Sequence, residues 1–171
     1  GRPYWYSHML AVQSPYRDRG IGSDLKLAQR DHARQSGIHL IEWTFDPLES
    51  KNAHFNINKL GVIVRRYYVN LYGATDSELQ RGLESDRTIA EWWIDEPRVG
   101  IEGDTRRVYI PADIQALKKQ SPKSAQDVQL RVREQFQKNI EDDYFVAGFE
   151  RKDEWSEYIF VSGASSVRQT D

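Results

Sequence analysis

The stretch Arg17-Asp18-Arg19-Gly20-Ile21-Gly22 follows a β-prone run and opens a helical pattern. Because a helix begins here, its first backbone N–H groups have no intrahelical partner, and together with the helix dipole they form an anion site. Gly20 and Gly22 carry no Cβ that would hold a phosphate away from the backbone, and Arg17 and Arg19 add forked donors for its oxygens. The loop therefore predicts a binding site for a diphosphate.

The loop lacks a required residue of each of two familiar phosphate-binding motifs. A P-loop requires a lysine after its last glycine, whereas Gly22 is followed by Ser23 and Asp24. A dinucleotide-binding fingerprint requires a third glycine, and Leu25 stands in its place. Glu42 does lie twenty residues after Gly22, where an acid that binds ribose is expected. A dinucleotide-binding oxidoreductase is therefore kept as a remote alternative.

The residues around the loop predict a strand–helix–strand unit. Residues 4–12 are aromatic and β-prone, and residues 38–44 form a second β-prone run. Between them, residues 22–36 repeat apolar residues at helical spacing, and Gly37 ends the helix. The predicted inward face of this helix consists of Ile21, Leu25, Ala28 and His32. So short a connection favours a parallel pair of strands.

The rest of the chain continues this alternation, so the predicted fold class is α/β (α+β), with a mixed, partly parallel central sheet flanked by helices. Within residues 1–95, a helix over 51–60, with Ser50 as its N-cap and Gly61 after its end, precedes strands at 62–68 and 88–94. Residues 96–106 are rich in Pro, Gly and acids and predict a linker. The block at 107–161 is predicted to contain strand 107–110, helices 112–119 and 124–140, and strands 144–150 and 157–161, followed by a frayed tail at 162–171.

Composition argues against several classes of function. The 171-residue chain is 39% hydrophobic and 29% charged, and its net charge of −2 argues against a general nucleic-acid binder. It has no cysteine, and its four histidines lack the spacing of metal ligands, so we expect no metal. No apolar run is long enough for a membrane span and no leader precedes the first strand, which favours the cytoplasm. The start Gly1-Arg2-Pro3, without an initiator Met, is typical of a fragment or a processed chain.

The stretch from Met9 to Gly22, MLAVQSPYRDRGIG, resembles the central motif of the GNAT superfamily of N-acetyltransferases. That motif is a strand ending in a small apolar residue and Val, a turn with Pro, and the pattern [Q/R]xxGxG/A leading into a helix. Arg17-x-x-Gly20-x-Gly22 matches its core residue for residue. With the following helix, the resemblance places this first motif at residues 9–36.

Residues 50–62 resemble a second motif of the same family. The helix end Asn58-Lys59-Leu60-Gly61 is similar to the K-L-G-F ending of that motif, with Asn52 and Ala53 as its early residues. Over about residues 4–94, and more loosely beyond, the chain resembles a bacterial subgroup of uncharacterised, predicted GNAT acetyltransferases.

The resemblance implies a GNAT-like acyl-CoA N-acyltransferase fold with acetyl-CoA as co-substrate. In this family the pantetheine arm lies beside the first strand, and the strands equivalent to 4–12 and 38–44 splay apart to admit it. Leu10, Ala11 and Val12 would contact the arm, and Asn52 would lie near it. The pyrophosphate would be held by Arg17, Arg19, Gly20, Ile21, Gly22 and Ser23.

The implied reaction is N-acetylation, in which the amine of a small acceptor attacks the thioester directly and a base takes the amine proton. We predict His8 as this base, because it shares a strand face with Leu10 and Val12 and because histidine exchanges protons near neutral pH. A half-buried structural histidine is the competing interpretation. Glu42 and Asp46, on the second strand, are further candidates.

The donor for the departing thiolate is the weak point of the match. The family's usual Tyr, four residues before the glycine of the second motif, is Ile57 here. Tyr67, Tyr68 or Tyr72 could reach in from the next strand. The missing Tyr also favours an alternative function, a non-catalytic acyl-CoA-binding module.

In the family, a strand, two helices and two more strands precede the strand equivalent to residues 4–12, and this chain lacks them. The block at 107–161 has the same order of elements. We therefore expect the block either to cover the sheet edge of the missing strands or to form a second lobe beside the first. The residues that select the acceptor come mainly from the missing helices, so the acceptor stays undefined, and a homo-oligomer stays open.

Overall fold

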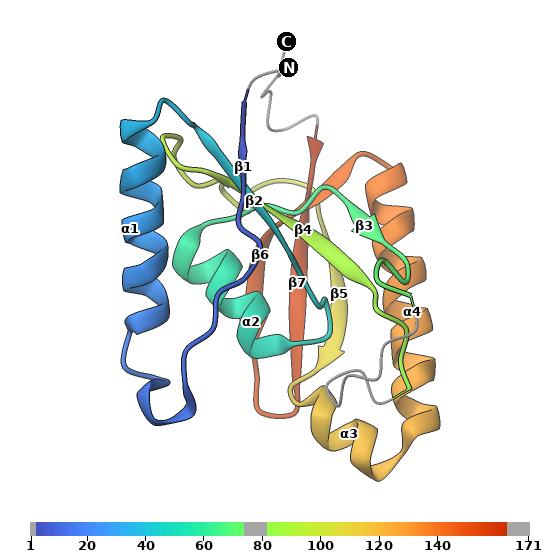
Figure 1. Ribbon diagram of the computed structural model, residues 1–171. Helices are drawn as coiled ribbons and strands as arrows, with labels where there is room; N and C mark the ends of the chain where they lie inside the picture. The colour runs from blue at the N-terminus through green and yellow to red at the C-terminus, as the bar shows by residue number, and fades with distance from the viewer. Residues whose placement is uncertain (1–2, 74–81, 164–171) are drawn as a thin grey trace.

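The computed structural model describes residues 3–73 and 82–163, which form a mixed α+β fold with two β-sheets. The helices and strands follow one another in the order β1, α1, β2, α2, β3, β4, β5, α3, α4, β6 and β7 (Figure 1). The predicted fold class, with helices on a mixed and partly parallel sheet, is confirmed at this level.

The first sheet has the strand order β1-β2-β4-β3. Its strands are β1 (Trp5–Tyr6), β2 (Leu40–Phe45), β4 (Arg87–Trp93) and β3 (Tyr67–Tyr68). As predicted, β1 runs parallel to β2, and the other two pairs of strands are antiparallel. The parallel pair therefore lies at one edge of this sheet.

The second sheet has the order β5-β7-β6 and is antiparallel throughout. Its strands are β5 (Thr105–Pro111), β7 (Trp155–Ser162) and β6 (Tyr144–Arg151). β6 and β7 pair as a hairpin and include the predicted strands 144–150 and 157–161. Two isolated bridges join the sheets, because Ile63 pairs with Glu91 of β4 and Val64 pairs with Val146 of β6. Residues 63–64 thus link the two sheets side by side.

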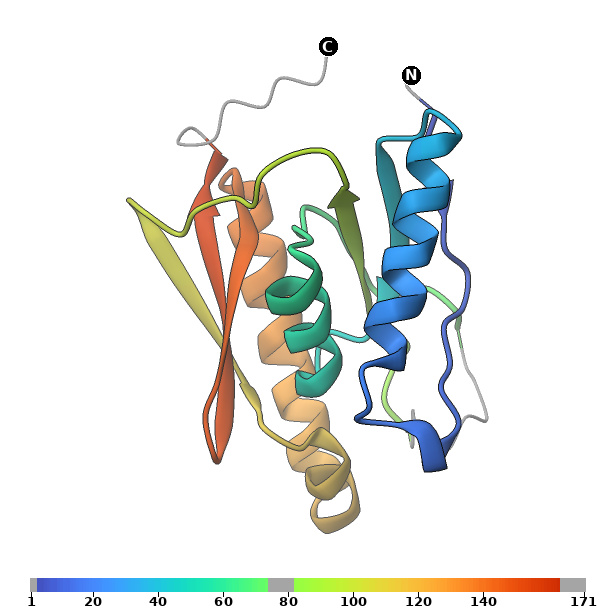
Figure 2. The ribbon, with the colours of Figure 1, turned by 90° about the vertical axis from the view of Figure 1, so that its left-hand side faces the viewer.

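Helices occupy the space between the sheets and one flank. Figure 2 shows α2 (Ser50–His54) and α4 (Pro122–Glu141) between the two sheets, and α4 contacts strands of both. α2 continues into the π-helical turn η2 (Phe55–Leu60), which ends at Gly61 in the left-handed conformation. The short α3 (Ile114–Gln120) precedes α4, and α1 (Ile21–Gln35) lies beside β1 and β2 (Figure 1).

One hydrophobic core contains residues from both halves of the chain. The ring of Phe136 in α4 lies 5.3 Å from that of Tyr67, 4.9 Å from that of Tyr158 and 5.0 Å from that of Phe160. Ile41 of β2 belongs to the same cluster. The pairs of Phe136 with Tyr158 and Phe160 are edge-to-face and the pair with Tyr67 is tilted. Such ring contacts add to the free energy gained by burial, so the two halves stabilise each other.

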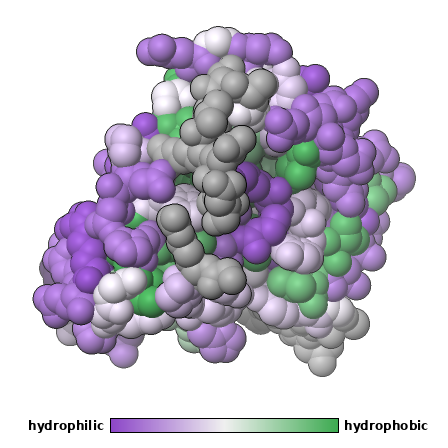
Figure 3. Space-filling model, turned by 90° about the horizontal axis from the view of Figure 1, so that it is seen from above, coloured by the Kyte–Doolittle hydropathy of each residue, from purple (hydrophilic) through white to green (hydrophobic). Residues whose placement is uncertain are grey.

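The charged residues of the chain lie mainly at the surface. Seen from above in Figure 3, the molecule shows mostly hydrophilic residues, with small separate hydrophobic areas between them.

Two predicted strands are much shorter in the structure. In the segment predicted as strand 4–12, only β1 pairs with β2; the amide of Ser7 still donates to the Glu42 carbonyl at 2.7 Å, and the chain then leaves the sheet. Because nothing continues β1 alongside Trp43 and Thr44, a gap opens there next to β2. In the segment predicted as strand 62–68, the chain makes only the two bridges and then the two-residue β3.

The inward face of α1 is displaced by one residue from the prediction. The predicted residues Leu25, Ala28 and His32 are exposed. The stripe that faces the protein contains Gly22, Lys26, Gln29 and Ala33, of which Lys26 and Ala33 are buried. Apolar spacing gave the wrong face because this helix turns a lysine inward and leaves Leu25 47% exposed.

The block after residue 106 joins the first sheet on the side away from β1. The strand order places β1 at one end, whereas residues 63–64 and β6 continue the sheet beyond β4. The expectation that this block covers the edge at residues 4–12 is therefore wrong. Its strands instead form the second sheet, in which Val146 of β6 pairs with Val64. β1 pairs with β2 and not with β6.

Candidate functional site

The loop before α1 is shaped by its local sequence. Pro15 lies in the 3-10 turn η1 (Ser14–Tyr16), after which the Arg17 Nε donates a hydrogen bond to the Val12 carbonyl at 3.0 Å. Gly20 is the N-cap of α1 and has φ +84°. Glycine adopts this left-handed conformation without steric strain, so the backbone itself requires Gly20.

The start of α1 presents free amides to a pocket of about 290 Å³. Among the described residues, the amides of Gly20, Ile21 and Gly22 donate no hydrogen bond to the main chain. The pocket is lined by Val12, Tyr16, Arg17, Asp18, Gly20, Ile21, Gly22, Ser23 and Phe55. Unpaired amides at the positive end of a helix dipole, with a guanidinium beside them, are suited to an anion.

Gly22, unlike Gly20, is not required by the fold. A Cβ built at this position would meet only the Phe55 Cζ, at an ordinary contact distance of 3.9 Å. A glycine within a helix costs about 1 kcal/mol relative to alanine. The chain therefore keeps bare backbone at a place where its own packing would accept a side chain, which indicates a ligand that approaches the backbone closely.

A second pocket, of about 150 Å³, lies where the chain leaves β2 after β1. It is lined by Ser7, His8, Met9, Leu10, Lys26, Trp43, Thr44, Asn52, Phe55 and Asn56. Phe55, the first residue of the π-helical turn, borders both pockets, so the two follow one another along residues 7–23. The pocket lies where the chain after Ser7 no longer pairs with β2.

The predicted site residues divide between these two pockets. Val12, Arg17, Gly20, Ile21, Gly22 and Ser23 line the first, and His8, Leu10 and Asn52 line the second. Ala11 and Arg19 are exposed and line neither. His8 is exposed, so its ring is open to solvent at the pocket and is not a half-buried structural histidine.

Lys26 is the residue of the second pocket that the sequence did not single out. Its side chain is buried, and its Nζ donates to the Ser7 Oγ at 3.0 Å and to the Gln29 Oε1 at 3.2 Å. The ammonium also lies 3.5 Å from the centre of the Trp43 ring. Burial lowers the pKa of Lys26 from 10.5 to about 8. The one sequence signal was the polar pair Lys26 and Gln29 at i and i+3, which lies on one face of the helix.

Ile57 stands where the resemblance implies a Tyr, and it offers no donor because it is an apolar side chain buried in the core. Tyr67 is also unsuitable: its hydroxyl donates to the Asp86 Oδ2 at 2.6 Å, and burial followed by this bond raises its pKa. Tyr72 is better placed, since its hydroxyl lies 2.8 Å from the Oγ1 of Thr44, which lines the second pocket.

Glu42, a candidate base, is engaged in a charged network. It lies directly opposite Glu91 in the register of β2 and β4, and Arg66 forms ion pairs with both carboxylates. Arg65 adds a second pair with Glu91 at 2.6 Å. Both carboxylates are already paired with guanidinium groups, so this network is better suited to holding the strands together.

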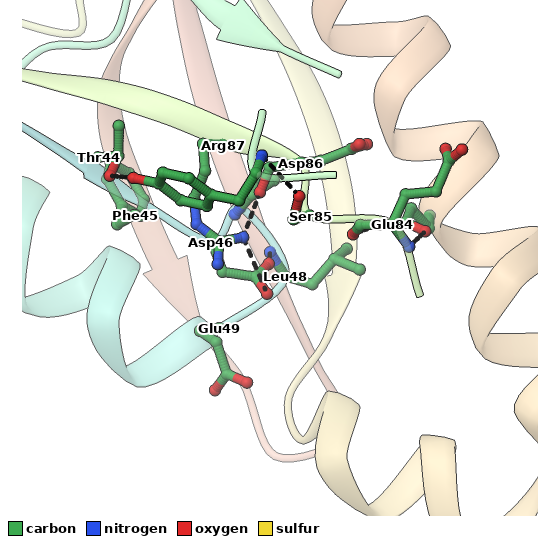
Figure 4. A network of polar contacts seen from close by, with 12 residues as sticks. Thr44, Phe45, Asp46, Leu48, Glu49, Glu84, Ser85, Asp86 and Arg87 are labelled. Atoms are coloured by element: carbon green, nitrogen blue, oxygen red, sulfur yellow. Dashed lines mark hydrogen bonds and ion pairs between the residues drawn. The ribbon is translucent and has the colours of Figure 1, made fainter. Parts of the chain in front are cut away.

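Asp46, the other acidic candidate, follows the end of β2 and lines neither pocket. Its carboxylate accepts from the Leu48 amide at 2.8 Å and lies 4.0 Å from the Arg87 guanidinium (Figure 4). Burial raises the pKa of Asp46. Figure 4 shows this turn facing the residues that lead into β4, so its contacts serve the junction of the two strands.

No protein-family model, curated protein or solved structure matches this chain. Within residues 3–73 and 82–163, no three His, Cys, Asp or Glu side chains are grouped so that they could hold a metal ion. In the same part of the chain, no helix is both long and apolar enough to cross a bilayer. The function is therefore inferred from the geometry and chemistry of the two pockets.

Proposed function

We propose that this chain is a GNAT-type N-acyltransferase that binds acetyl-CoA along residues 7–23 and transfers the acetyl group to the amine of a small acceptor. The observation that carries the proposal is the first pocket. Its lining includes Arg17 and the residues Gly20–Gly22, whose backbone amides donate no main-chain hydrogen bond and two of which have no side chain. This combination suits a diphosphate, and coenzyme A contains one.

The rest of the cofactor would follow the chain from the first pocket to the second. Leu10, Ala11 and Val12 lie outside any strand, and the Val12 carbonyl already accepts from the Arg17 Nε. A pantetheine arm would pair with the main chain of Leu10 and Ala11 as an added strand does. The thioester would then reach the second pocket, which Phe55 connects to the first.

In the reaction, the acceptor nitrogen forms a bond to the thioester carbonyl carbon and the carbon–sulfur bond breaks. His8, exposed at the second pocket, takes the proton from the amine. Tyr72 is the donor that the contacts favour for the departing thiolate, since its hydroxyl is bonded to Thr44 at the pocket wall. The products are an amide and free coenzyme A.

A second candidate function, a non-catalytic acyl-CoA-binding module, is favoured by one observation. Ile57 occupies the place of the family's usual Tyr and is buried, so no side chain at that place reaches a bound thioester. Release of free thiol from acetyl-CoA in the presence of a panel of amines separates the two functions, because a binding module releases none.

The loop assignment is tested by Gly22→Glu. Glutamate is a better helix former than glycine and is favoured in the first turn of a helix. We therefore expect the free energy of unfolding of Gly22→Glu to be no lower than that of the wild type and up to about 1 kcal/mol higher. Its carboxylate would repel a diphosphate, so the affinity for coenzyme A should fall by about a hundredfold, as expected when one charged contact becomes repulsive. Isothermal titration calorimetry and urea unfolding measure the two quantities.

Gly22→Ala is the matched control, because it adds a Cβ that meets only Phe55 and brings no charge. Because this Cβ would hold the phosphate away from the backbone, the affinity of Gly22→Ala for coenzyme A should fall, but by less than that of Gly22→Glu, which also adds a repulsive charge. Unaltered binding of coenzyme A by Gly22→Glu would contradict the assignment of this loop as the diphosphate site. Titration with NADH in the same experiment tests the dinucleotide alternative, which requires tighter binding of NADH than of coenzyme A.

A further inference from the structure

The orientation of α1 leaves apolar residues exposed and buries a lysine. Leu25 and Leu27 are 47% and 38% exposed, whereas Lys26 between them is 3% exposed. Rotating the helix by about 100° would bury a leucine and release the lysine to solvent. A local rule broken in this way, with no gain in packing, is most common at a functional site.

The ammonium of Lys26 lacks an acidic partner. No ion pair joins it to a carboxylate of the described residues, and the pocket around it is lined by no Asp or Glu. Its contacts are the neutral Ser7 and Gln29 oxygens and the face of Trp43. A buried cation without a counter-ion is costly, and a bound anion would remove most of that cost.

The other groups of the lining are compatible with an anion. Thr44, Asn52 and Asn56 bring neutral groups that can donate hydrogen bonds, and Asn56 is itself 1% exposed. Facing Lys26 from the segment after β1, His8 is the only other titratable side chain of the lining; β2, α2 and η2 contribute none to it. The pocket therefore offers positive charge and donors, with nothing that repels a carboxylate.

We propose that the second pocket binds a carboxylate at the far end of the acyl group, so that the preferred co-substrate is the CoA thioester of a short dicarboxylic acid. The proposal rests on the proposed function, which brings the acyl end of the thioester into this pocket. The volume of about 150 Å³ corresponds to about five water molecules at ~30 Å³ each, which leaves room for a short chain beyond the carbonyl. The Lys26 ammonium then pairs with the carboxylate, and Ser7 and the two asparagines complete its hydrogen bonds.

The test compares succinyl-CoA with butyryl-CoA, which has the same number of acyl carbons and a methyl group in place of the carboxylate. Calorimetry at pH 7 should show that the wild type prefers succinyl-CoA by about tenfold or more, as expected of one charge-assisted hydrogen bond in a buried site. In Lys26→Met the ratio of the two affinities should fall to about one, and in Leu25→Ala, on the exposed neighbour, the ratio should stay at the wild-type value.

A second measurement uses the wild type alone. Since the pKa of the free Lys26 lies at about 8, binding of a carboxylate at pH 9.5 requires the uptake of a proton. The preference for succinyl-CoA should therefore decline by about tenfold between pH 7 and pH 9.5, while the affinity for butyryl-CoA changes little.

The outcomes distinguish the two proposals. Equal affinities for both thioesters in the wild type, or a preference that persists in Lys26→Met, overturn the carboxylate pocket and leave the assignment of the loop intact. Failure of coenzyme A and of both thioesters to bind overturns the proposed function, and the carboxylate pocket with it.

Discussion

Asp86→Ala is expected to lower the free energy of unfolding by about 3–5 kcal/mol, the range found when one partner of a buried charge pair is removed. Asp86 is 1% exposed and receives hydrogen bonds from Arg133 at 2.9 Å and from the Tyr67 hydroxyl at 2.6 Å. It also accepts from the Asn70 amide at 3.0 Å. All three donors would lose a partner in a place that water enters poorly, and Arg133 would keep its ion pair with Glu84, whose side chain is 51% exposed.

This change acts on the whole molecule, because Arg133 lies in α4 and Asp86 lies just before β4. Urea unfolding followed by tryptophan fluorescence and by circular dichroism should show one transition, shifted to lower urea by both probes. Asp127→Ala is the matched control on the same helix. Its carboxylate is 62% exposed and 3.6 Å from Lys123, so we expect a change within about 0.5 kcal/mol. A loss as small as that for Asp86→Ala would contradict a buried pair between the two halves.

The helices and most strand positions could be predicted from the sequence because they depend on local signals. Gly37 and Gly61 both adopt the left-handed conformation that ends a helix, and the β6–β7 hairpin lies close to its predicted position. Strand lengths could not be predicted, because a strand needs a neighbour. Residues 8–12 are β-prone but run past β2 without pairing, and Val64 pairs with a strand more than eighty residues later.

The candidate site was only partly predictable for a similar reason. The loop residues Arg17, Gly20 and Gly22 could be found because their chemistry depends on spacing along the chain. The second pocket depends on which way α1 faces, and the apolar pattern indicated the wrong face by one residue. The sequence therefore did not predict Lys26 as a site residue, since a lysine on a helix is normally expected in solvent.

Lys26→Met is expected to raise the free energy of unfolding at pH 7. The pKa of Lys26 falls from 10.5 in the unfolded chain to about 8 in the folded protein. At about 1.4 kcal/mol per unit, this shift corresponds to a destabilisation of about 3 kcal/mol when the ammonium is charged. Met fills a similar space without a charge, and the loss of the Trp43 contact and of the bonds to Ser7 and Gln29 offsets about 1 kcal/mol. A net gain of about 2 kcal/mol should remain.

The pH dependence gives this prediction its sign. Below pH 8 both the folded and the unfolded chain carry the proton on Lys26, so the full cost is present. Between pH 8 and pH 10.5 the unfolded chain binds more protons than the folded one, so the stability of the wild type rises relative to that of Lys26→Met. The wild type regains about 3 kcal/mol against a difference of about 2 kcal/mol, so its stability should equal that of Lys26→Met between pH 8 and pH 10.5 and end about 1 kcal/mol higher. Lys51→Met, at an exposed lysine of α2, should match the wild type throughout. A variant less stable than the wild type at pH 7 would show that Lys26 holds the fold together. A more stable variant that no longer distinguishes succinyl-CoA from butyryl-CoA would show that the chain keeps a costly buried charge for its ligand.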